Sequence, residues 1–137
     1  MASLDQEQIT MTAEMSHTNS AAQDKIQQLI HAIETQPQRV EFSQVMSVID
    51  ACYDYTPCQF SNGGVENEAG SNEGSCKLFA FAKLQQLNQA QTLALFGHFY
   101  RDEVLSDPEG SSHANIRAFM QNGWQGVQFS APPLVLR

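Results

Sequence analysis

The stretch NEAGSNEGSCKLFAFAKLQ, residues 67–85, decides the fold of this 137-residue chain. Its first half is a polar loop rich in glycine, and its second half is apolar on nearly every side of a helix over residues 75–87. A helix that is hydrophobic all round is buried in the protein interior. The sequence therefore predicts a central helix over 75–87, entered through the glycine loop, with Ser75 as its N-cap.

Further helical patterns lie on both sides of this central helix. Apolar residues recur at helical spacing in residues 22–36, 43–53, 90–105 and 112–122. Pro37 ends the first of these helices, since proline disfavours the helical conformation of the residue before it. Asn88 is the expected N-cap of the helix over 90–105, and Ser112 that of the helix over 112–122. Phe81 and Phe96 are expected in the core.

Two strand signals flank the central helix in the sequence. The segment TPCQFSNGGVENEAG alternates polar and apolar residues around Asn62-Gly63-Gly64, which is typical of a β-hairpin. The segment QGVQFS, residues 125–130, alternates in the same way and is expected to pair with the hairpin, before Pro132-Pro133 end the regular structure. The predicted fold is α+β: a mostly helical single domain of about five helices with a small antiparallel β-sheet.

The charge of the chain excludes several classes of partner. Fifteen acidic residues against seven basic ones give a net charge of −8, whereas nucleic-acid binding requires a basic surface. The same balance argues against an anionic membrane surface. Cys52, Cys58 and Cys76 follow no metal-binding or disulfide spacing, so we expect reduced thiols and a cytoplasmic protein.

The first part of the chain differs in composition from the rest. Residues 1–21 are polar and contain few large apolar side chains, so we expect a flexible leader before a single domain over residues 22–137. This composition fits a type III secretion signal. It fits equally an ordinary tail or an alternative start at Met11 or Met15.

Four ordered blocks carry a family resemblance. The blocks are VIDACYDYTPCQFSNG, NEAGSNEGSCKLFAFA, FGHFYRDEVL and HANIRAFMQNGWQGVQF. Together they resemble the HopJ type III effector family over about residues 25–130. The resemblance implies a protein that a type III secretion system delivers into a host cell. It implies a host or bacterial protein partner, and it brings no established enzymatic activity and no catalytic residues.

Cys76 is the candidate nucleophile. A thiol at a helix N-terminus is activated by the helix dipole, and His98 or His113 downstream could act as its base. This arrangement would make a cysteine-dependent hydrolase or transferase. Glu68 and Glu73 just upstream would oppose a thiolate, however, and a free cysteine at the start of an apolar helix usually packs in the core. We therefore expect a structural role for Cys76. A binding protein is accordingly expected rather than an enzyme.

No cofactor or metal is expected. The spacing from Gly70 to Gly74 is one residue too short for a phosphate-binding P-loop. The acidic residues of this loop do not follow the order of a calcium-binding EF-hand, and no histidine has a second histidine three or four residues away.

A set of polar and aromatic residues in the four blocks forms the candidate binding site. These residues are Tyr55, Asn67, Glu68, Tyr100, Arg101, His113, Arg117 and Trp124. Polar groups among aromatic side chains are typical of a binding cleft. The alternative is structural, with Arg101 and Arg117 pairing with Asp54, Asp102 or Glu68.

Overall fold

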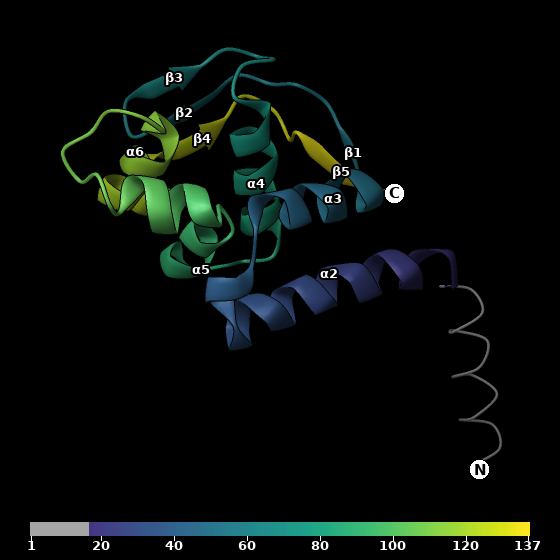
Figure 1. Ribbon diagram of the computed structural model, residues 1–137. Coiled ribbons are helices and arrows are strands. Elements are labelled where there is room, and N and C mark those ends of the chain that lie inside the picture. Colours follow the sequence, from purple (N-terminus) through teal and green to yellow (C-terminus); the bar gives the residue numbers. More distant parts are fainter. Residues whose placement is uncertain (1–16) are drawn as a thin grey trace, which may run out of the picture.

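The computed structural model describes residues 17–137, and Figure 1 shows its helices and strands. The α-helices are α2 (His17–Thr35), α3 (Phe42–Cys52), α4 (Glu73–Leu84), α5 (Gln89–Ala94) and α6 (Ala114–Asn122). The strands are β1 (Tyr53–Tyr55), β2 (Phe60–Asn62), β3 (Val65–Asn67), β4 (Val127–Phe129) and β5 (Leu134–Leu136). Short 3₁₀ segments η1 (Pro37–Arg39) and η3 (Gly123–Gly126) and a π-helical segment η2 (Phe99–Val104) complete the fold. The predicted α+β class is confirmed.

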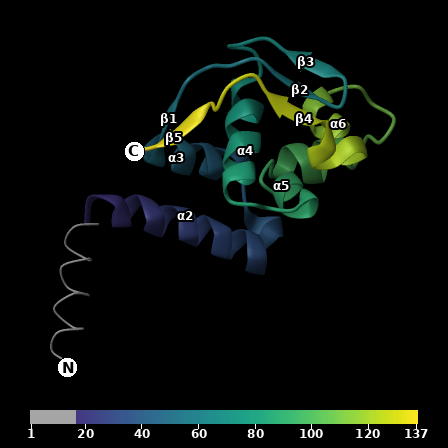
Figure 2. The same ribbon diagram turned by 180° about the vertical axis from the view of Figure 1, so that it is seen from behind.

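The central helix is α4. Five successive residues, Leu78–Ala82, are buried, and the Phe79 and Phe81 side chains have no exposed surface. The Phe79 ring lies 5.0–6.3 Å from the rings of Phe60, Phe96, Phe119 and Trp124. Figures 1 and 2 show α4 in the middle of the molecule, with α3 on one side and α5 and α6 on the other. The apolar character of residues 78–82 on all sides explains this position.

The hairpin and its third strand form as predicted. The strands β2 and β3 pair antiparallel around Gly63 and Gly64, whose φ angles of +57° and +92° suit glycine. The strand β4 pairs with the other edge of β2, so that the strand order is β3-β2-β4. The three-stranded sheet therefore joins the middle of the chain to its last part.

The expectation that Pro132-Pro133 end the regular structure is wrong. After the prolines, β5 pairs antiparallel with β1, with Leu134 opposite Tyr55 and Leu136 opposite Tyr53. A proline lacks only the donor, so its carbonyl still accepts, and the Thr56 amide donates to Pro133 O at 2.9 Å. The predicted helix over 43–53 accordingly ends at Cys52, because Tyr53 already belongs to β1.

The predicted helix over 90–105 is interrupted. The helix α5 ends at Ala94, and a turn leads through Gly97 into η2. Gly97 has φ +63°, and a Cβ there would lie 2.8 Å from the Phe42 amide nitrogen at the start of α3. A close approach between two backbones thus overrides the helical periodicity of this segment.

Two of the three predicted N-caps are wrong. The helix α4 begins at Glu73 after Asn72, and α6 begins at Ala114 after His113. Asn72 and His113 have left-handed φ angles of 51° and 54° and cap no amide with their side chains, so neither Ser75 nor Ser112 is a cap. Asn88 is confirmed, because its side-chain oxygen accepts from the Gln91 amide at 2.8 Å.

The beginning of the first helix also differs from the expected one. The helix α2 starts at His17 rather than residue 22, and it ends at Thr35, just before Pro37. The rest of the predicted leader, residues 1–16, lies outside the described residues. In the part of the chain that the structure covers, no helix combines the length and apolar character needed to cross a membrane.

Candidate functional site

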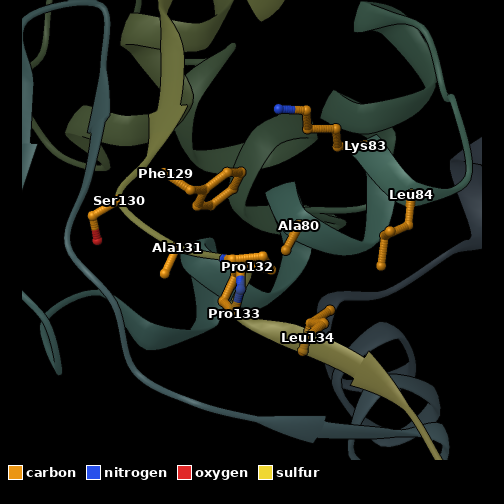
Figure 3. A pocket seen from close by; sticks show the side chains of 9 residues that line it. All are labelled: Ala80, Lys83, Leu84, Phe129, Ser130, Ala131, Pro132, Pro133 and Leu134. Atoms are coloured by element: carbon orange, nitrogen blue, oxygen red, sulfur yellow. The ribbon is translucent and has the colours of Figure 1, made fainter.

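An open groove lies between the second half of α4 and the segment that joins β4 to β5. Its cavity volume is about 590 Å³. Figure 3 shows Ala80, Lys83 and Leu84 on the α4 side and the chain from Phe129 to Leu134 on the other side. Alanine, leucine, phenylalanine and two prolines make this lining mainly apolar, which is the usual character of a binding groove.

Lys83 is the ionisable residue in the lining of this groove. Its Nζ lies 5.8 Å from the centroid of the Phe129 ring, close enough for a weak cation–π contact. Lys77, six residues earlier in α4, donates to Asp50 Oδ1 at 2.8 Å. Lys83 has no carboxylate partner within the described part of the chain. Its positive charge is therefore free to meet a ligand.

Exposed apolar side chains occur in the groove and in the strand that follows it. Leu84, Val135 and Leu136 are 55%, 61% and 40% exposed. Leu84 lines the groove, and the other two follow Leu134 in β5. Exposed apolar side chains beside an apolar groove commonly mark an interaction site.

A second cavity, of about 470 Å³, lies where the first turns of α4 and α6 meet. It is lined by Phe42, Val65, Asn72, Gly74, Ser75, Phe96, Phe99, His113, Ala114, Asn115 and Ile116. Aromatic rings form one part of this wall, and amide, hydroxyl and imidazole groups form another. Most of these polar side chains are hydrogen-bonded to one another or to neighbouring groups, as the two networks below show.

The first network links two histidines and two glutamates beside the second cavity. Glu41 accepts from Arg101 Nη2 at 2.7 Å and contacts His98 Nδ1 at 3.0 Å. Glu103 contacts the other side of His98 at 3.6 Å and His113 Nε2 at 2.9 Å. Hydrogen bonds from His98, with the Arg101 charge adding to them, hold the pKa of Glu41 below its usual value.

The second network is a cluster of asparagine amides. Asn115 donates to Asn67 Oδ1 at 2.9 Å and accepts from the Nδ2 atoms of Asn62 and Asn67 at 3.1 and 3.2 Å. Asn72 donates to Asn67 Oδ1 at 2.7 Å. Asn62, Asn67 and Asn115 are buried. Of the buried side-chain oxygens and nitrogens in the described residues, only Asn62 Oδ1 lacks a partner. The cluster thus ties β2 and β3 to α6.

Cys76 is 1% exposed and lies in α4 against Cys58 and Tyr55. Burial, followed by the neighbouring Cys58, raises the pKa of the Cys76 thiol to about 12. The ring nitrogens of His98 and His113 contact Glu41 and Glu103 instead. This geometry favours a packed thiol over a nucleophile with a histidine base.

The predicted binding residues fall into separate places. Arg101 and His113 belong to the histidine–glutamate network, and Asn67 to the amide cluster beside it. Tyr55 lies apart, next to Cys76, and burial raises its pKa. Trp124 donates from Nε1 to Leu87 O at 2.9 Å and packs on Phe119. Glu68 is exposed and Tyr100 half-buried.

The predicted ion pairs of the two arginines are wrong. Arg101 pairs with Glu41 and also donates to the carbonyl of Val40 at 3.0 Å. Arg117 donates to the carbonyls of Asp107 and Ser112 and so closes the loop before α6. Both side chains satisfy backbone carbonyls, which have no signature in the sequence.

The chain matches the family model described as "HopJ type III effector protein" over residues 26–134. It belongs to the HopJ family. Among solved structures, it is similar to a crystal structure of the unknown-function protein VPA0580, with 47% sequence identity and a TM-score of 0.80. That match covers 81% of this chain and 92% of the other. No curated protein matches the chain.

Sequence reasoning missed the groove of this HopJ protein. The sequence predicts Lys83 and Leu84 as part of the central helix. It predicts residues 131–134 as an irregular end of the chain. No signal in the sequence marks the groove, because the 55% exposure of Leu84 depends on the three-dimensional arrangement. Among the described residues, no group of three histidine, cysteine or acidic side chains is arranged to hold a metal.

Proposed function

We propose that this HopJ-family chain is an effector-like protein-interaction domain that binds its partner through the groove between α4 and residues 129–134. The carrying observation is the groove itself, a cavity of about 590 Å³ with a mainly apolar lining that includes the exposed side chain of Leu84. A surface of this kind gains free energy when a partner covers it, at about 25 cal/mol per Å² of apolar area.

The contacts of Cys76 support a binding role rather than a catalytic one. A thiol with a raised pKa stays protonated at neutral pH, whereas a cysteine nucleophile must be a thiolate. Neither His98 nor His113 makes a hydrogen bond to it among the described residues. No observation favours the hydrolase or transferase alternative.

Membership of a family named for type III effectors supports a further step of the proposal. The chain would be made in the bacterial cytoplasm and delivered by a type III system into a host cell, where a host protein is the partner. Its net charge of −8 supports a protein partner over nucleic acid or an anionic membrane.

Site-specific photo-crosslinking tests the proposed surface. A benzophenone amino acid replaces Leu84 in the groove or, as a matched control, Leu105, which is 49% exposed and lies outside it. We expect one discrete protein adduct from host or bacterial lysate at position 84 and none at position 105. Unlabelled wild-type chain should compete for this adduct, and a Leu84→Asp chain should not. Equal labelling at both positions, or equal competition by both chains, would overturn the proposal.

A further inference from the structure

We infer that the groove takes an extended segment of the partner, with apolar side chains in the groove and a carboxylate on Lys83. The inference rests on the proposed function, because it names the chemistry of what fills the same groove. Three features of the described residues support it: the apolar lining, the free charge and the unpaired edge of β5.

The lining dictates apolar contacts. Ala80 and Leu134 are buried beneath the groove, while Leu84 and Pro132 are exposed at its surface. Two successive prolines carry no amide hydrogen, so this wall offers apolar rings and carbonyl groups rather than backbone donors. The free energy of binding is therefore most favourable when a partner places leucine-like or aromatic side chains against α4.

The charge of Lys83 selects an acidic group. The other cations on or near this face have partners, since Lys77 pairs with Asp50 at 2.8 Å and Arg137 with Asp54 at 2.9 Å. Lys83 instead lies beside the Phe129 ring at the groove. A carboxylate that reaches Nζ would pair with it at the edge of an apolar surface. A second copy of the chain, docked with its two-fold axis through the groove, would bring two Lys83 charges together, so a different protein is the better occupant.

The strand β5 favours an extended peptide. Its register places Val135 opposite Asp54, and the flanking bonds Thr56 N to Pro133 O and Arg137 N to Cys52 O run to the β1 side. Because antiparallel hydrogen bonds alternate, the backbone groups of Leu134 and Leu136 point to the other edge. Figures 1 and 2 both place β5 between β1 and α4, so this edge lies on the side of α4, whose second half lines the groove. An extended segment can add to such an edge as a further strand.

A random peptide library displayed on phage tests the inference with the full-length chain. Peptides are selected on the wild-type chain and counter-selected on Leu84→Asp, which removes apolar contact in the groove. We expect enriched peptides that combine two or more apolar residues with an aspartate or glutamate. An enriched set without acidic residues would overturn the assignment of the occupant while leaving the groove as the binding surface.

A charge swap then identifies the cation. For a selected synthetic peptide, Lys83→Glu should weaken binding about three- to tenfold, as expected for one exposed ion pair. Replacing the acidic residue of the peptide by lysine should restore binding to Lys83→Glu. Lys25→Glu, on the exposed part of α2, is the matched control and should bind like the wild type.

The remaining outcomes also decide between the two proposals. Equal binding of the peptide to the wild type and Lys83→Glu would refute the carboxylate contact. A failure to select any peptide that depends on Leu84 would refute the groove and with it the proposed function. A wild-type dimer that Leu84→Asp dissociates in sedimentation equilibrium would make a second copy the occupant and overturn the inference.

Discussion

The groove and the cavity between α4 and α6 differ in one respect. At the cavity, polar side chains are hydrogen-bonded within the chain, whereas at the groove apolar side chains and a charge stay exposed. At the cavity, the amides of Asn67 and Asn115 and the ring of His113 bond to neighbours in the same chain. At the groove, Leu84 is 55% exposed and Lys83 has no carboxylate partner among the described residues. Groups that bond to each other stabilise the fold, whereas exposed apolar surface and a free charge are available to a partner.

This difference predicts opposite effects of substitution. Changes at the polar networks should lower stability and leave partner binding intact in the fraction that folds. Changes at the groove should leave stability nearly unchanged and weaken or abolish binding. The four substitutions below test this contrast, beginning with the largest expected effect.

The largest effect is expected in the core that both regions share. Phe81→Ala removes a ring that has no exposed surface and packs edge-on against Tyr53 with centroids 6.0 Å apart. The lost burial of the ring and the cavity that it leaves should together lower the free energy of unfolding by about 3–5 kcal/mol. Urea denaturation followed by circular dichroism measures this difference. A change below about 1 kcal/mol would mean that α4 is not the central helix.

Asn115→Ala should have the next largest effect. It removes three hydrogen bonds among buried amides, from Asn62 Nδ2 and Asn67 Nδ2 to Asn115 Oδ1 and from Asn115 Nδ2 to Asn67 Oδ1, and each contributes roughly 0.5–1.5 kcal/mol. We expect a loss of about 2–4 kcal/mol in urea denaturation, with unchanged affinity for the groove peptide in the folded protein. A variant as stable as the wild type but deficient in binding would reverse the roles of the two regions.

Leu84→Asp should change folding little and binding strongly. The side chain is 55% exposed, so the free energy of unfolding should shift by no more than about 0.5 kcal/mol. Peptide or partner binding should fall below detection for two reasons. The substitution removes the apolar contact of Leu84, and the new carboxylate competes with that of the partner for the charge of Lys83. Leu105→Asp provides the control, with a similar exposed fraction of 49% and no expected effect on binding.

Glu41→Gln tests the histidine–glutamate network through pH. The pKa of Glu41 in the folded protein lies below the ordinary value of 4.5, so its contribution to stability is present above pH 4.5 and lost as the pH falls through the folded value. Glutamine does not titrate, and the variant should lose less stability than the wild type on acidification below pH 4.5. Thermal unfolding from pH 6 to about 3 measures both curves. Identical slopes would contradict the network, and Glu34→Gln, on the exposed face of α2, is the control.

Hydrophobic periodicity and turn residues account for what the sequence could predict of the fold. The apolar run Leu78–Ala82 located α4, and Asn62-Gly63-Gly64 located the hairpin. The break at Gly97 and the pairing of β5 with β1 were missed, since both depend on backbone segments far away in the chain. Local sequence patterns do not predict contacts between backbone segments that are far apart in the chain.

The site was harder to predict than the fold for a related reason. Arg101 and His113 are conspicuous in the sequence, yet whether a polar group bonds within the chain depends on distant residues such as Glu41 and Glu103. The groove is made of ordinary residues, and its character follows from the exposure of Leu84 and from the path of residues 129–134. Only the three-dimensional arrangement shows that exposure.

Nuclear magnetic resonance titration of the ¹⁵N-labelled chain with a selected peptide tests most directly which region binds. We predict chemical-shift changes at the amides of Lys83, Leu84, Ala131 and Leu134, with signals from the first turn of α6 at Ala114–Ile116 unaffected. Leu84→Asp should abolish these changes. Shifts concentrated at Ser75, His113 and Asn115, with the groove amides unmoved, would contradict the account and identify the polar cavity as the binding site.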